Sequence, residues 1–350
     1  MSGNVEKKMT YVRLGNSGLK VSKIILGTMQ YGSPEWQDWV IGDEEEVFKH
    51  IKFAYDAGIQ TFDTADMYSN GLSEILLGKA IKKLNLPREE IVVMTKVYNT
   101  VAREHGTYMS ASGIDPDALG YVNQRGLSRK HIFQAAKHSL VRLQLDYVDV
   151  IQCHRFDYNT PIEETMQALH DVVQAGYARY IGMSSCWAWQ FQAMQDYAIQ
   201  NRLTPFISMQ NHHNLLYREE EREMLPCTKH FGVGCIAWSP LARGLLTRPL
   251  DVKTKRGAVD FYIGKYTQAQ GTPTIMKRLE ETANKRGVSM AQIAIAWTLH
   301  KEGWMTAPIV GTTSLKNLQD IIGGAHITLS KEEIEYLEEP YQPQNVFGHI

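Results

Sequence analysis

Four side chains that can hold or transfer a proton stand at the ends of apolar segments of this 350-residue chain. Asp63 and Tyr68 follow one segment. Lys96 ends the next, and His154 ends a third. Taken singly, each has an ordinary structural role, as a turn residue, a packed ring, a surface ammonium or a buried imidazole. Together, at three successive strand ends, they predict one site.

These residue types suit general acid–base chemistry. A phenol with an ordinary pKa of about 10 is a weak acid at neutral pH, and a neighbouring ammonium favours its phenolate form. A carboxylate paired with the ammonium would hold both groups in place, and an imidazole would orient the oxygen of a substrate. The set is suited to protonating the oxyanion that forms when a hydride reaches a carbonyl group, a step that general acid catalysis accelerates by about 10²–10⁴-fold.

Eight short apolar runs alternate with longer amphipathic segments. Nearly continuous apolar runs are typical of parallel strands that are buried on both faces. The alternation favours a (β/α)₈ TIM barrel, in which catalytic residues lie at the carboxyl ends of the strands. A doubly wound open sheet is the alternative, but no GxGxxG follows the first run. The expected strands are Ile24–Met29, Ile59–Asp63, Ile91–Val97, Tyr147–Cys153, Ala178–Met183, Phe206–Gln210, Val233–Trp238 and Met305–Val310.

Capping residues mark the starts of several helices between these strands. Asp43 precedes three glutamates, and Ser128 precedes an apolar stripe. Thr160 and Glu163 form the pattern of a capping box, as does the pair that starts at Ser330. We expect a helix to begin directly after each of these four positions.

Two connections are longer than a barrel needs, namely 98–126 after the third strand and 245–273 after the seventh. In a barrel, such additions form long βα loops on the catalytic face. The segment before Ile24 carries Gly15 and Gly18 between short alternating runs, which predicts an N-terminal hairpin. Neither connection has the composition of a linker, so residues 1–350 are expected to form a single barrel domain.

The composition excludes several classes of function. Lys plus Arg number 37 and Asp plus Glu number 38, so no strongly basic surface for nucleic acid is expected. Four Cys without a CxxC pattern predict reduced thiols, and we expect no metal. No apolar run is long enough to span a bilayer, and residues 1–10 lack a secretory signal pattern. A cytoplasmic protein with no membrane or nucleic-acid partner is expected, and the oligomeric state is left open.

The sequence resembles the aldo-keto reductases from Tyr11 to about Glu339. Gly58–Ser69 closely matches that family's signature at its second strand, and Leu143–His154 matches its fourth. The resemblance continues over 178–184 and 237–246, in the order and at the spacing of a barrel. The details are more similar to the fungal aryl-alcohol dehydrogenase-like branch than to the aldose reductase branch.

This resemblance implies a catalytic tetrad of Asp63, Tyr68, Lys96 and His154. Tyr68 would be the acid–base, Lys96 and Asp63 its tuning pair, and His154 the orienting group. It also implies NADPH (NADP+), bound without a Rossmann fold, with Trp238 stacked on the nicotinamide. The other residues implied in cofactor binding are Ser184, Ser185, Gln210, Ser239, Leu241, Arg243, Leu245, Gly311, Thr312, Thr313, Ser314, Lys316 and Asn317.

The expected substrate pocket is rich in aromatic residues. Met29, Tyr31, Tyr98 and Trp187 follow the first, third and fifth strands and are candidates for its wall. Such a wall suits a planar aromatic carbonyl. We therefore expect an NADP-dependent alcohol dehydrogenase that reduces an aldehyde or ketone, reversibly in principle, with Tyr68 as general acid.

Two alternatives fit the same residues. A Schiff-base aldolase on the same barrel would use Lys96 as its nucleophile, although it would leave Tyr68 and His154 without roles. A nicotinamide-binding redox sensor or scaffold subunit would have an intact tetrad with little turnover. Turnover with a reduced nicotinamide, or a substrate adduct on Lys96, would distinguish these three hypotheses.

Overall fold

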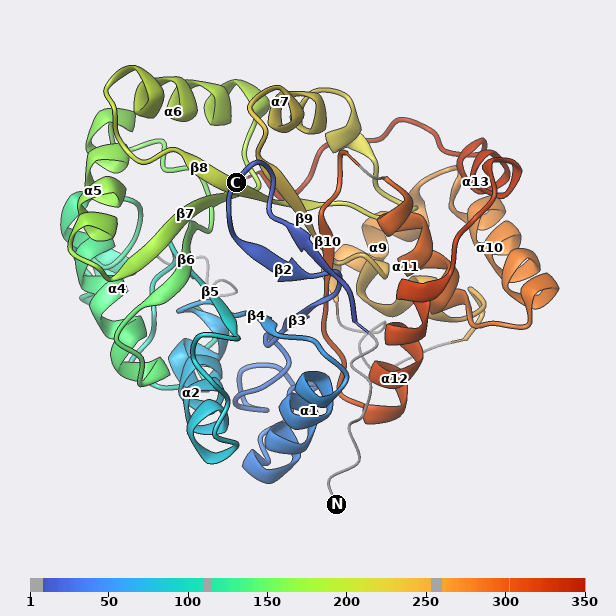
Figure 1. Ribbon diagram of the computed structural model, residues 1–350, viewed down its shortest axis with the longest axis horizontal. Coiled ribbons are helices and arrows are strands. Elements are labelled where there is room, and N and C mark those ends of the chain that lie inside the picture. The colour runs from blue at the N-terminus through green and yellow to red at the C-terminus, as the bar shows by residue number, and fades with distance from the viewer. Residues whose placement is uncertain (1–8, 110–114, 253–259, 302, 350) are drawn as a thin grey trace. The chain divides into compact units, whose positions relative to one another are not determined.

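The computed structural model describes residues 9–109, 115–252, 260–301 and 303–349 (Figure 1). Eight strands form a closed barrel in the order β10-β3-β4-β5-β6-β7-β8-β9, which confirms the predicted (β/α)₈ fold. The observed strands lie within or close to the predicted runs. They are β3 (Ile25–Gly27), β4 (Thr61–Asp63), β5 (Val92–Val97), β6 (Val148–Cys153), β7 (Ala178–Ser184), β8 (Phe206–His212), β9 (Gly234–Trp238) and β10 (Ala307–Val310).

The described chain divides into two compact units. The first contains 26–209 and position 349, and the second contains 9–25 and 210–348. In the first unit, β3 to β7 pair in parallel, each strand with the next. The register sets Asp63 opposite Met94 and Lys96 opposite Gln152. The carboxyl ends of β4, β5 and β6 therefore lie next to one another.

The helices of the first unit follow its strands in sequence, as in βα repeats. They are α1 (Glu44–Asp56), α2 (Leu72–Lys83), α4 (Arg129–Leu143), α5 (Ile162–Gln174) and α6 (Ala188–Gln200). Two predicted caps are confirmed, because Asp43 accepts a bond from the Glu46 N–H and Ser128 accepts one from the His131 N–H.

The predicted cap at Thr160 is wrong. The helix begins at Ile162, with Pro161 as its N-cap residue and no capping side chain. Thr160 instead donates its hydroxyl to Asp157 Oδ2 at 2.7 Å. The Thr160 side chain is therefore held by the buried Asp157 carboxylate, which also accepts the Leu127 N–H, and it accepts no N–H of the helix end.

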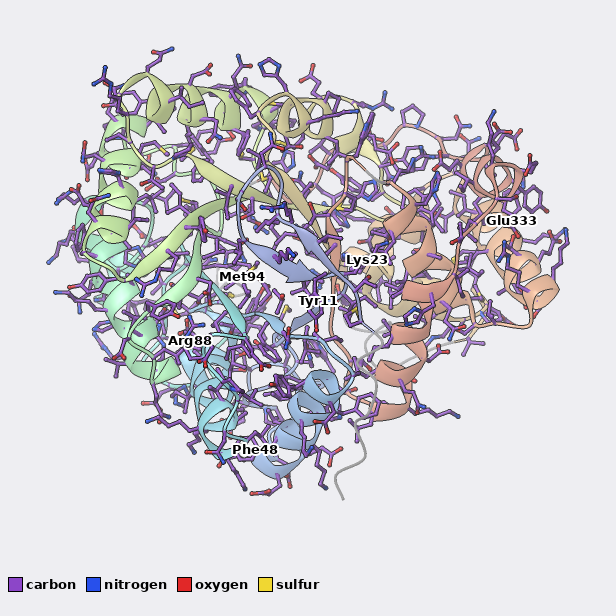
Figure 2. The ribbon with its side chains drawn as sticks, viewed as in Figure 1. Tyr11, Lys23, Phe48, Arg88, Met94 and Glu333 are labelled. Atoms are coloured by element: carbon purple, nitrogen blue, oxygen red, sulfur yellow. The ribbon has the colours of Figure 1, made fainter. Side chains whose placement is uncertain are left out.

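The strands are buried on both faces, as their composition predicts. Every residue of β5 and β6 is buried, including Met94, which is labelled in Figure 2. Burying a large apolar side chain stabilises a fold by about 1.5–3 kcal/mol. The same strands carry Lys96 and Gln152, so the site's polar side chains are held by a rigid apolar scaffold.

The second unit contains the predicted N-terminal hairpin. β1 (Tyr11–Arg13) pairs antiparallel with β2 (Lys20–Ser22). The hairpin packs on the start of β9, where the Asn16 N–H donates to the Gly232 carbonyl at 2.7 Å. A Cβ on Gly234 would lie 2.5 Å from the Gly15 nitrogen, so glycine is required for this approach.

Six helices of the second unit fall within the described residues. They are α7 (Met224–His230), α9 (Phe261–Gln268), α10 (Thr272–Arg286), α11 (Met290–His300), α12 (Leu315–Gly323) and α13 (Lys331–Glu338). The predicted capping box at Ser330 is confirmed, since Ser330 and Glu333 bond each other's backbone N–H groups. Glu333, labelled in Figure 2, also receives a two-pronged ion pair from Arg286.

Both long connections are present. The one after β5 contains the 3₁₀ turn Pro116–Leu119, and the one after β9 contains the turn Ala242–Thr247 and α9. Residues 110–114 and 253–259 of these connections, and residues 1–8, on which the expectation of no secretory signal rests, lie outside the described residues. Among the helices that the structure describes, none has the length and hydropathy needed to cross a bilayer.

Candidate active site

Lys96 is the centre of the predicted tetrad, all of which lies in the first unit. Its side chain is fully buried near the end of β5, where Nζ has three oxygen partners. It donates to Asp63 Oδ2 at 2.6 Å, to the Thr64 carbonyl at 2.8 Å and to Tyr68 Oη at 3.3 Å. The three donor hydrogens of the ammonium therefore have three acceptors.

Asp63 holds the ammonium in its charged form. Burial alone would lower the pKa of Lys96, but the charge of Asp63, together with Tyr68, outweighs burial and raises that pKa above its usual value. The other carboxylate oxygen, Asp63 Oδ1, accepts from Gln152 Nε2 at 3.1 Å. Because both carboxylate oxygens are engaged by neighbouring strands, the position of Nζ is fixed.

Tyr68 stands five residues after β4, at the start of the 3₁₀ turn Tyr68–Gly71. Its ring is partly exposed, and Nζ of Lys96 lies 5.0 Å from the ring centroid. The His154 ring is 6.0 Å away, nearly perpendicular at 84°. The phenol oxygen is thus held from the buried side by an ammonium while the ring retains an accessible side.

His154 follows β6 directly and is buried at 8% exposure. Burial, and then the charges of Arg155 and Lys96, hold the pKa of His154 well below its usual range, so the ring is neutral at pH 7. Asn99 Nδ2 lies 3.4 Å from His154 Nδ1. Because an amide nitrogen only donates, Nδ1 accepts, and the ring proton resides on Nε2.

The arrangement can therefore supply two donors to one substrate oxygen. The Tyr68 phenol is a proton donor whose conjugate base would be stabilised by the Lys96 ammonium. A neutral imidazole with its proton on Nε2 donates a hydrogen bond from that nitrogen, and it does not compete with the substrate for the proton of Tyr68. These are the roles that the sequence predicts for the four residues.

The predicted pocket residues of the first unit differ in environment. Met29 and Tyr98 are partly exposed, and Trp187 is 40% exposed, with its ring 4.9 Å from that of His349. Tyr31 is 1% exposed, its ring packs edge-on against His50 of α1, and its hydroxyl oxygen lies 3.4 Å from His50 Nδ1. The place of Tyr31 in the pocket stays a prediction.

The predicted cofactor residues of the first unit, Ser184 and Ser185, lie at the end of β7 and are buried. Ser185 has φ +36°, a left-handed conformation that few side chains adopt and that is often found at functional sites.

In the second unit, Trp238 ends β9 and stacks on His212, with ring centroids 4.0 Å apart and planes at 10°. Trp238 remains partly exposed, and Gln210 is buried in β8. The backbone after Trp238 is left-handed at Ser239 and Arg243, among others. Turns of this kind point successive N–H groups to one side, which is suited to an anion.

Arg243 is engaged within its own loop. Its guanidinium pairs with Asp260 at 2.8 Å and lies 4.1 Å from the centroid of the Tyr262 ring. Leu241 is buried beside it, and Leu245 is partly buried. A phosphate at Arg243 would thus have to share the guanidinium with Asp260.

The segment after β10 leads into the N-terminus of α12. Ser314 caps this helix by accepting the Asn317 N–H, and its own N–H donates to Thr312 Oγ1 at 3.3 Å. Gly311, Thr313, Lys316 and Asn317 are exposed. A helix N-terminus with exposed hydroxyl and ammonium groups favours a phosphate, so this segment fits the adenosine phosphate of a dinucleotide.

Sequence reasoning missed the residues that surround the tetrad. Gln152 and Asn99 each contact a member of it, and Trp36 places its ring 6.5 Å from that of Tyr68. Gln152 lies in β6, two residues before His154, so strand alternation could have identified it. Asn99 and Trp36 lie in loops, where no periodicity signals a contact.

Comparison with known proteins agrees with this geometry. Residues 23–342 match the model of the Aldo/keto reductase family. The chain is 50% identical, over 97% of its length and 98% of the other's, to a Schizosaccharomyces pombe protein named as a candidate aryl-alcohol dehydrogenase. It is 49% identical, over 97% and 98%, to versiconal hemiacetal acetate reductase of Aspergillus parasiticus. The chain therefore belongs to the aldo/keto reductase family, among fungal relatives of the aryl-alcohol dehydrogenase type.

Proposed function

We propose that this protein reduces aromatic aldehydes or ketones to alcohols, with NADPH as hydride donor and Tyr68 as general acid, in a reversible reaction. The observation that carries the proposal is the ammonium of Lys96, which bridges Asp63 and the Tyr68 oxygen. Membership of the family supports an oxidoreductase that acts on carbonyl groups.

The proton transfer is assigned to Tyr68. As the carbonyl oxygen gains negative charge, the Tyr68 O–H bond breaks and the proton moves to that oxygen. The resulting phenolate oxygen stays beside Lys96 Nζ, which is 3.3 Å away and keeps its own protons. His154 donates from Nε2 to the same substrate oxygen and so fixes its position between the two donors. Asp63 and Gln152 keep Lys96 in register and take no part in proton transfer.

NADPH supplies a hydride to the carbonyl carbon when it is bound. In the first unit, Ser184 and Ser185 would hold its carboxamide. In the second, Trp238 would stack on the nicotinamide, with Gln210, Ser239, Leu241, Arg243 and Leu245 along the rest of the cofactor. Thr313 and Lys316 at the start of α12 would hold the adenosine phosphate. The exposed Lys316 ammonium would pair with the extra phosphate that NADPH carries and NADH lacks, which is the basis for proposing NADPH.

An aromatic substrate is supported by two observations. Tyr98 and Trp187 are partly exposed in the unit that holds Tyr68, and flat rings bind flat rings with low conformational cost. Two relatives carry names that refer to an aryl alcohol and to versiconal hemiacetal acetate. A small-molecule carbonyl compound is thus the partner that we propose.

The aldolase alternative is disfavoured by the charge of Lys96. Schiff-base formation needs a free amine, and Asp63 raises the pKa of Lys96 instead of lowering it. The redox-sensor alternative keeps the same residues and is separated from the proposal only by turnover.

The decisive experiment follows NADPH absorbance with 4-nitrobenzaldehyde, with an NADH arm in parallel. Tyr68→Phe removes the proton donor alone and is expected to lower kcat by about 10²–10⁴-fold. Tyr336→Phe makes the same change on exposed α13 and should leave kcat as it is.

Three results would lead to different conclusions. Loss of NADPH in the wild type but not in Tyr68→Phe supports the proposal. Tight NADPH binding without turnover of any aldehyde or quinone favours the sensor. Full activity of Tyr68→Phe would show that another group donates the proton.

A further inference from the structure

The turn that follows Tyr68 has an uncommon backbone. Ser69, Asn70 and Gly71 have φ values of +45°, +49° and +89°, so three successive residues are left-handed. For residues other than glycine this conformation costs about 1–2 kcal/mol each. Such a cost is tolerated where the surrounding contacts require that backbone, which directs attention to what these residues hold.

Asn70 holds the loop after β5. Its side-chain Nδ2 lies 3.0 Å from the Glu104 carbonyl, 3.2 Å from that of His105 and 2.6 Å from that of Thr107. Its Oδ1 accepts the Ala102 N–H at 2.9 Å. An amide has two hydrogens, so one is shared among the three carbonyls. Only a side chain that donates and accepts at once satisfies this set, and Asn70 is 5% exposed.

The held segment leads into Tyr108, which is linked to Tyr68 through the ring of Trp36. Tyr108 follows Thr107, is 40% exposed, and packs edge-on against Trp36 with ring centroids 5.5 Å apart. Trp36 is 3% exposed, and its ring also contacts that of Tyr68, with centroids 6.5 Å apart. The three rings thus form an aromatic wall in which Tyr108 and Tyr68 keep accessible sides and Trp36 is covered.

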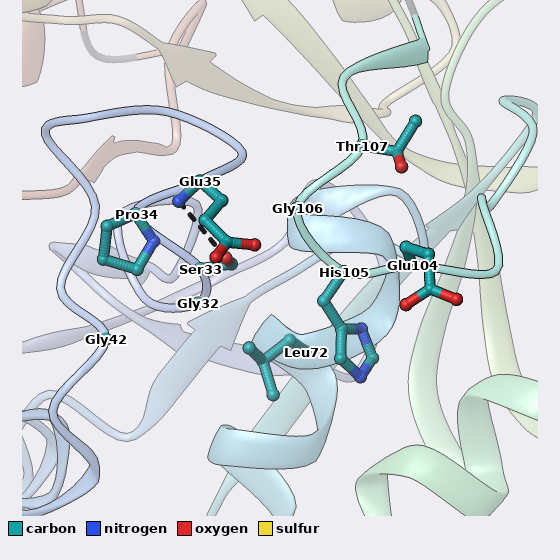
Figure 3. Close-up of a pocket in the computed structure, with 10 residues that line it drawn as sticks. All are labelled: Gly32, Ser33, Pro34, Glu35, Gly42, Leu72, Glu104, His105, Gly106 and Thr107. Atoms are coloured by element: carbon teal, nitrogen blue, oxygen red, sulfur yellow. Dashed lines mark hydrogen bonds between the residues drawn. The ribbon is translucent and has the colours of Figure 1, made fainter.

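The loop that carries Trp36 is held by the same turn. Ser69 Oγ accepts the Ser33 N–H at 3.0 Å, and a Cβ on Gly32 would lie 2.1 Å from that oxygen. The two loops also meet, because a Cβ on Gly106 would lie 2.5 Å from Glu35 Oε2. Figure 3 shows the open groove that they border, with 32–35 from one loop and 104–107 from the other. The turn after Tyr68 therefore fixes both loops.

We propose that Asn70 is a positioning residue which holds Tyr108 at a set place beside Tyr68, and that Tyr108 makes the site selective for flat aryl carbonyl compounds. This inference rests on the proposed carbonyl reduction. In this proposal, Asn70 contacts neither the substrate nor the cofactor. It acts by holding the backbone of 102–107, so that an aryl ring finds a wall already in place.

The first test is Asn70→Asp, which keeps the shape of the side chain but removes its N–H donors. The carboxylate would face three carbonyl oxygens and release the loop. For 4-nitrobenzaldehyde, KM should rise about tenfold, the effect expected of one or two lost hydrogen bonds, while kcat changes far less. The ratio of kcat/KM for this aldehyde to that for butanal should fall by the same factor. Asn201→Asp, which removes an amide donor at the exposed end of α6, is the matched control.

Two changes at the exposed Tyr108 keep the inference testable if Asn70→Asp folds poorly. Tyr108→Ala should lower the aryl-to-butanal ratio about as much as Asn70→Asp does, and Tyr108→Phe should retain it. The double variant Asn70→Asp/Tyr108→Ala should be no worse than either single one, because both remove the same wall. Additive losses would overturn the inference, as would equal losses for both aldehydes.

Limited trypsin digestion measures, without any turnover, how firmly Asn70 holds the backbone of 102–107, a set of contacts that we call the clamp. Arg103 lies in the held segment and is exposed, so cleavage after it measures how often the loop opens. Cleavage should be faster in Asn70→Asp than in the wild type and Asn201→Asp, and an unchanged rate would contradict the clamp. Faster cleavage in a protein whose wild type reduces no aldehyde would leave the clamp standing and reject the proposed function. An unaltered aldehyde ratio in an active enzyme would reject the role of Asn70 in selectivity.

Discussion

Two consecutive residues of β5 contact two different buried ion pairs. Lys96 pairs with Asp63 on one side of the strand. Thr95, whose side chain points to the opposite side, donates to Glu74 Oε1 at 2.5 Å, and Glu74 Oε2 accepts from Arg142 Nε at 2.6 Å. The first pair lies beside Tyr68, and the second links α2 to α4.

The difference lies in what remains open to a substrate. Glu74 is satisfied by Thr95 and Arg142, and Arg142 also donates to Ser139, so this pair closes on itself. The Lys96 pair extends to a phenol that is partly exposed. Arg142 is itself 17% exposed, but a guanidinium does not give up a proton in proteins. The two pairs therefore differ because only the Lys96 pair ends on an accessible group that has a proton to transfer.

The largest effect should come from Lys96→Met. It removes the ammonium that stabilises a Tyr68 phenolate, and kcat of the folded enzyme should fall by about 10²–10⁴-fold. NADPH binding, followed by fluorescence, should persist. Lys79→Met, which removes an exposed ammonium on α2, serves as the control. A kcat within tenfold of the wild type would remove the distinction between the two pairs.

The pair of Lys96 with Asp63 could be predicted from the sequence, whereas the pair of Glu74 with Arg142 could not. Strand ends are visible as breaks in apolar runs, and in a barrel they converge, so Asp63, Lys96 and His154 could be placed together. Glu74 and Arg142 lie 68 positions apart on two helices. Nothing in either helix's periodicity indicates that their polar residues meet.

Loop contacts and competing acceptors explain the other differences. The carbonyls that Asn70 holds are backbone groups, which leave no trace in residue types. Thr160 matches the capping pattern, yet its hydroxyl donates to Asp157. The prediction failed because the capping pattern does not indicate which other partner the side chain will find.

Glu74→Gln should separate stability from catalysis. It removes the buried carboxylate that pairs with Arg142, and breaking a fully buried pair typically costs about 3–5 kcal/mol. Because Arg142 is itself 17% exposed, we expect a loss of no more than about 3 kcal/mol. Urea unfolding should show this loss, while kcat per folded molecule should stay close to that of the wild type.

The matched control is Glu44→Gln, whose partner Lys79 is exposed and whose loss should cost at most about 1 kcal/mol. A large fall in kcat of folded Glu74→Gln, with little change in unfolding, would reverse the roles assigned to the two pairs.

Thr95→Val is a smaller change beside the pair of Glu74 with Arg142. It keeps the shape of the side chain and removes only the donor to Glu74, and a hydrogen bond to a charged group contributes about 1.5–3 kcal/mol. Thr298→Val removes a buried hydroxyl with a neutral acceptor in α11 and should cost less, about 0.5–1.5 kcal/mol. Equal losses in the two variants would mean that the charge on Glu74 adds nothing to this bond.

The smallest effect is a pH dependence of stability to which His154, on the Tyr68 side of β5, should contribute. The pKa of His154 is lowered in the folded state, mainly by burial, so the unfolded chain binds more protons just below the usual value of about 6.5. The stabilising contribution of neutral His154 is complete above that value and is lost as pH falls toward the lowered pKa. One such group changes the free energy of unfolding by at most about 1.4 kcal/mol per pH unit.

Urea unfolding at pH 5 and pH 7 should therefore show a smaller difference in His154→Gln than in the wild type. His131, whose pKa burial also lowers, accounts for part of what remains. Thr298→Val, which alters no titratable group, should keep the difference of the wild type. A His154→Gln difference equal to that of the wild type would mean that folding does not lower the pKa of His154.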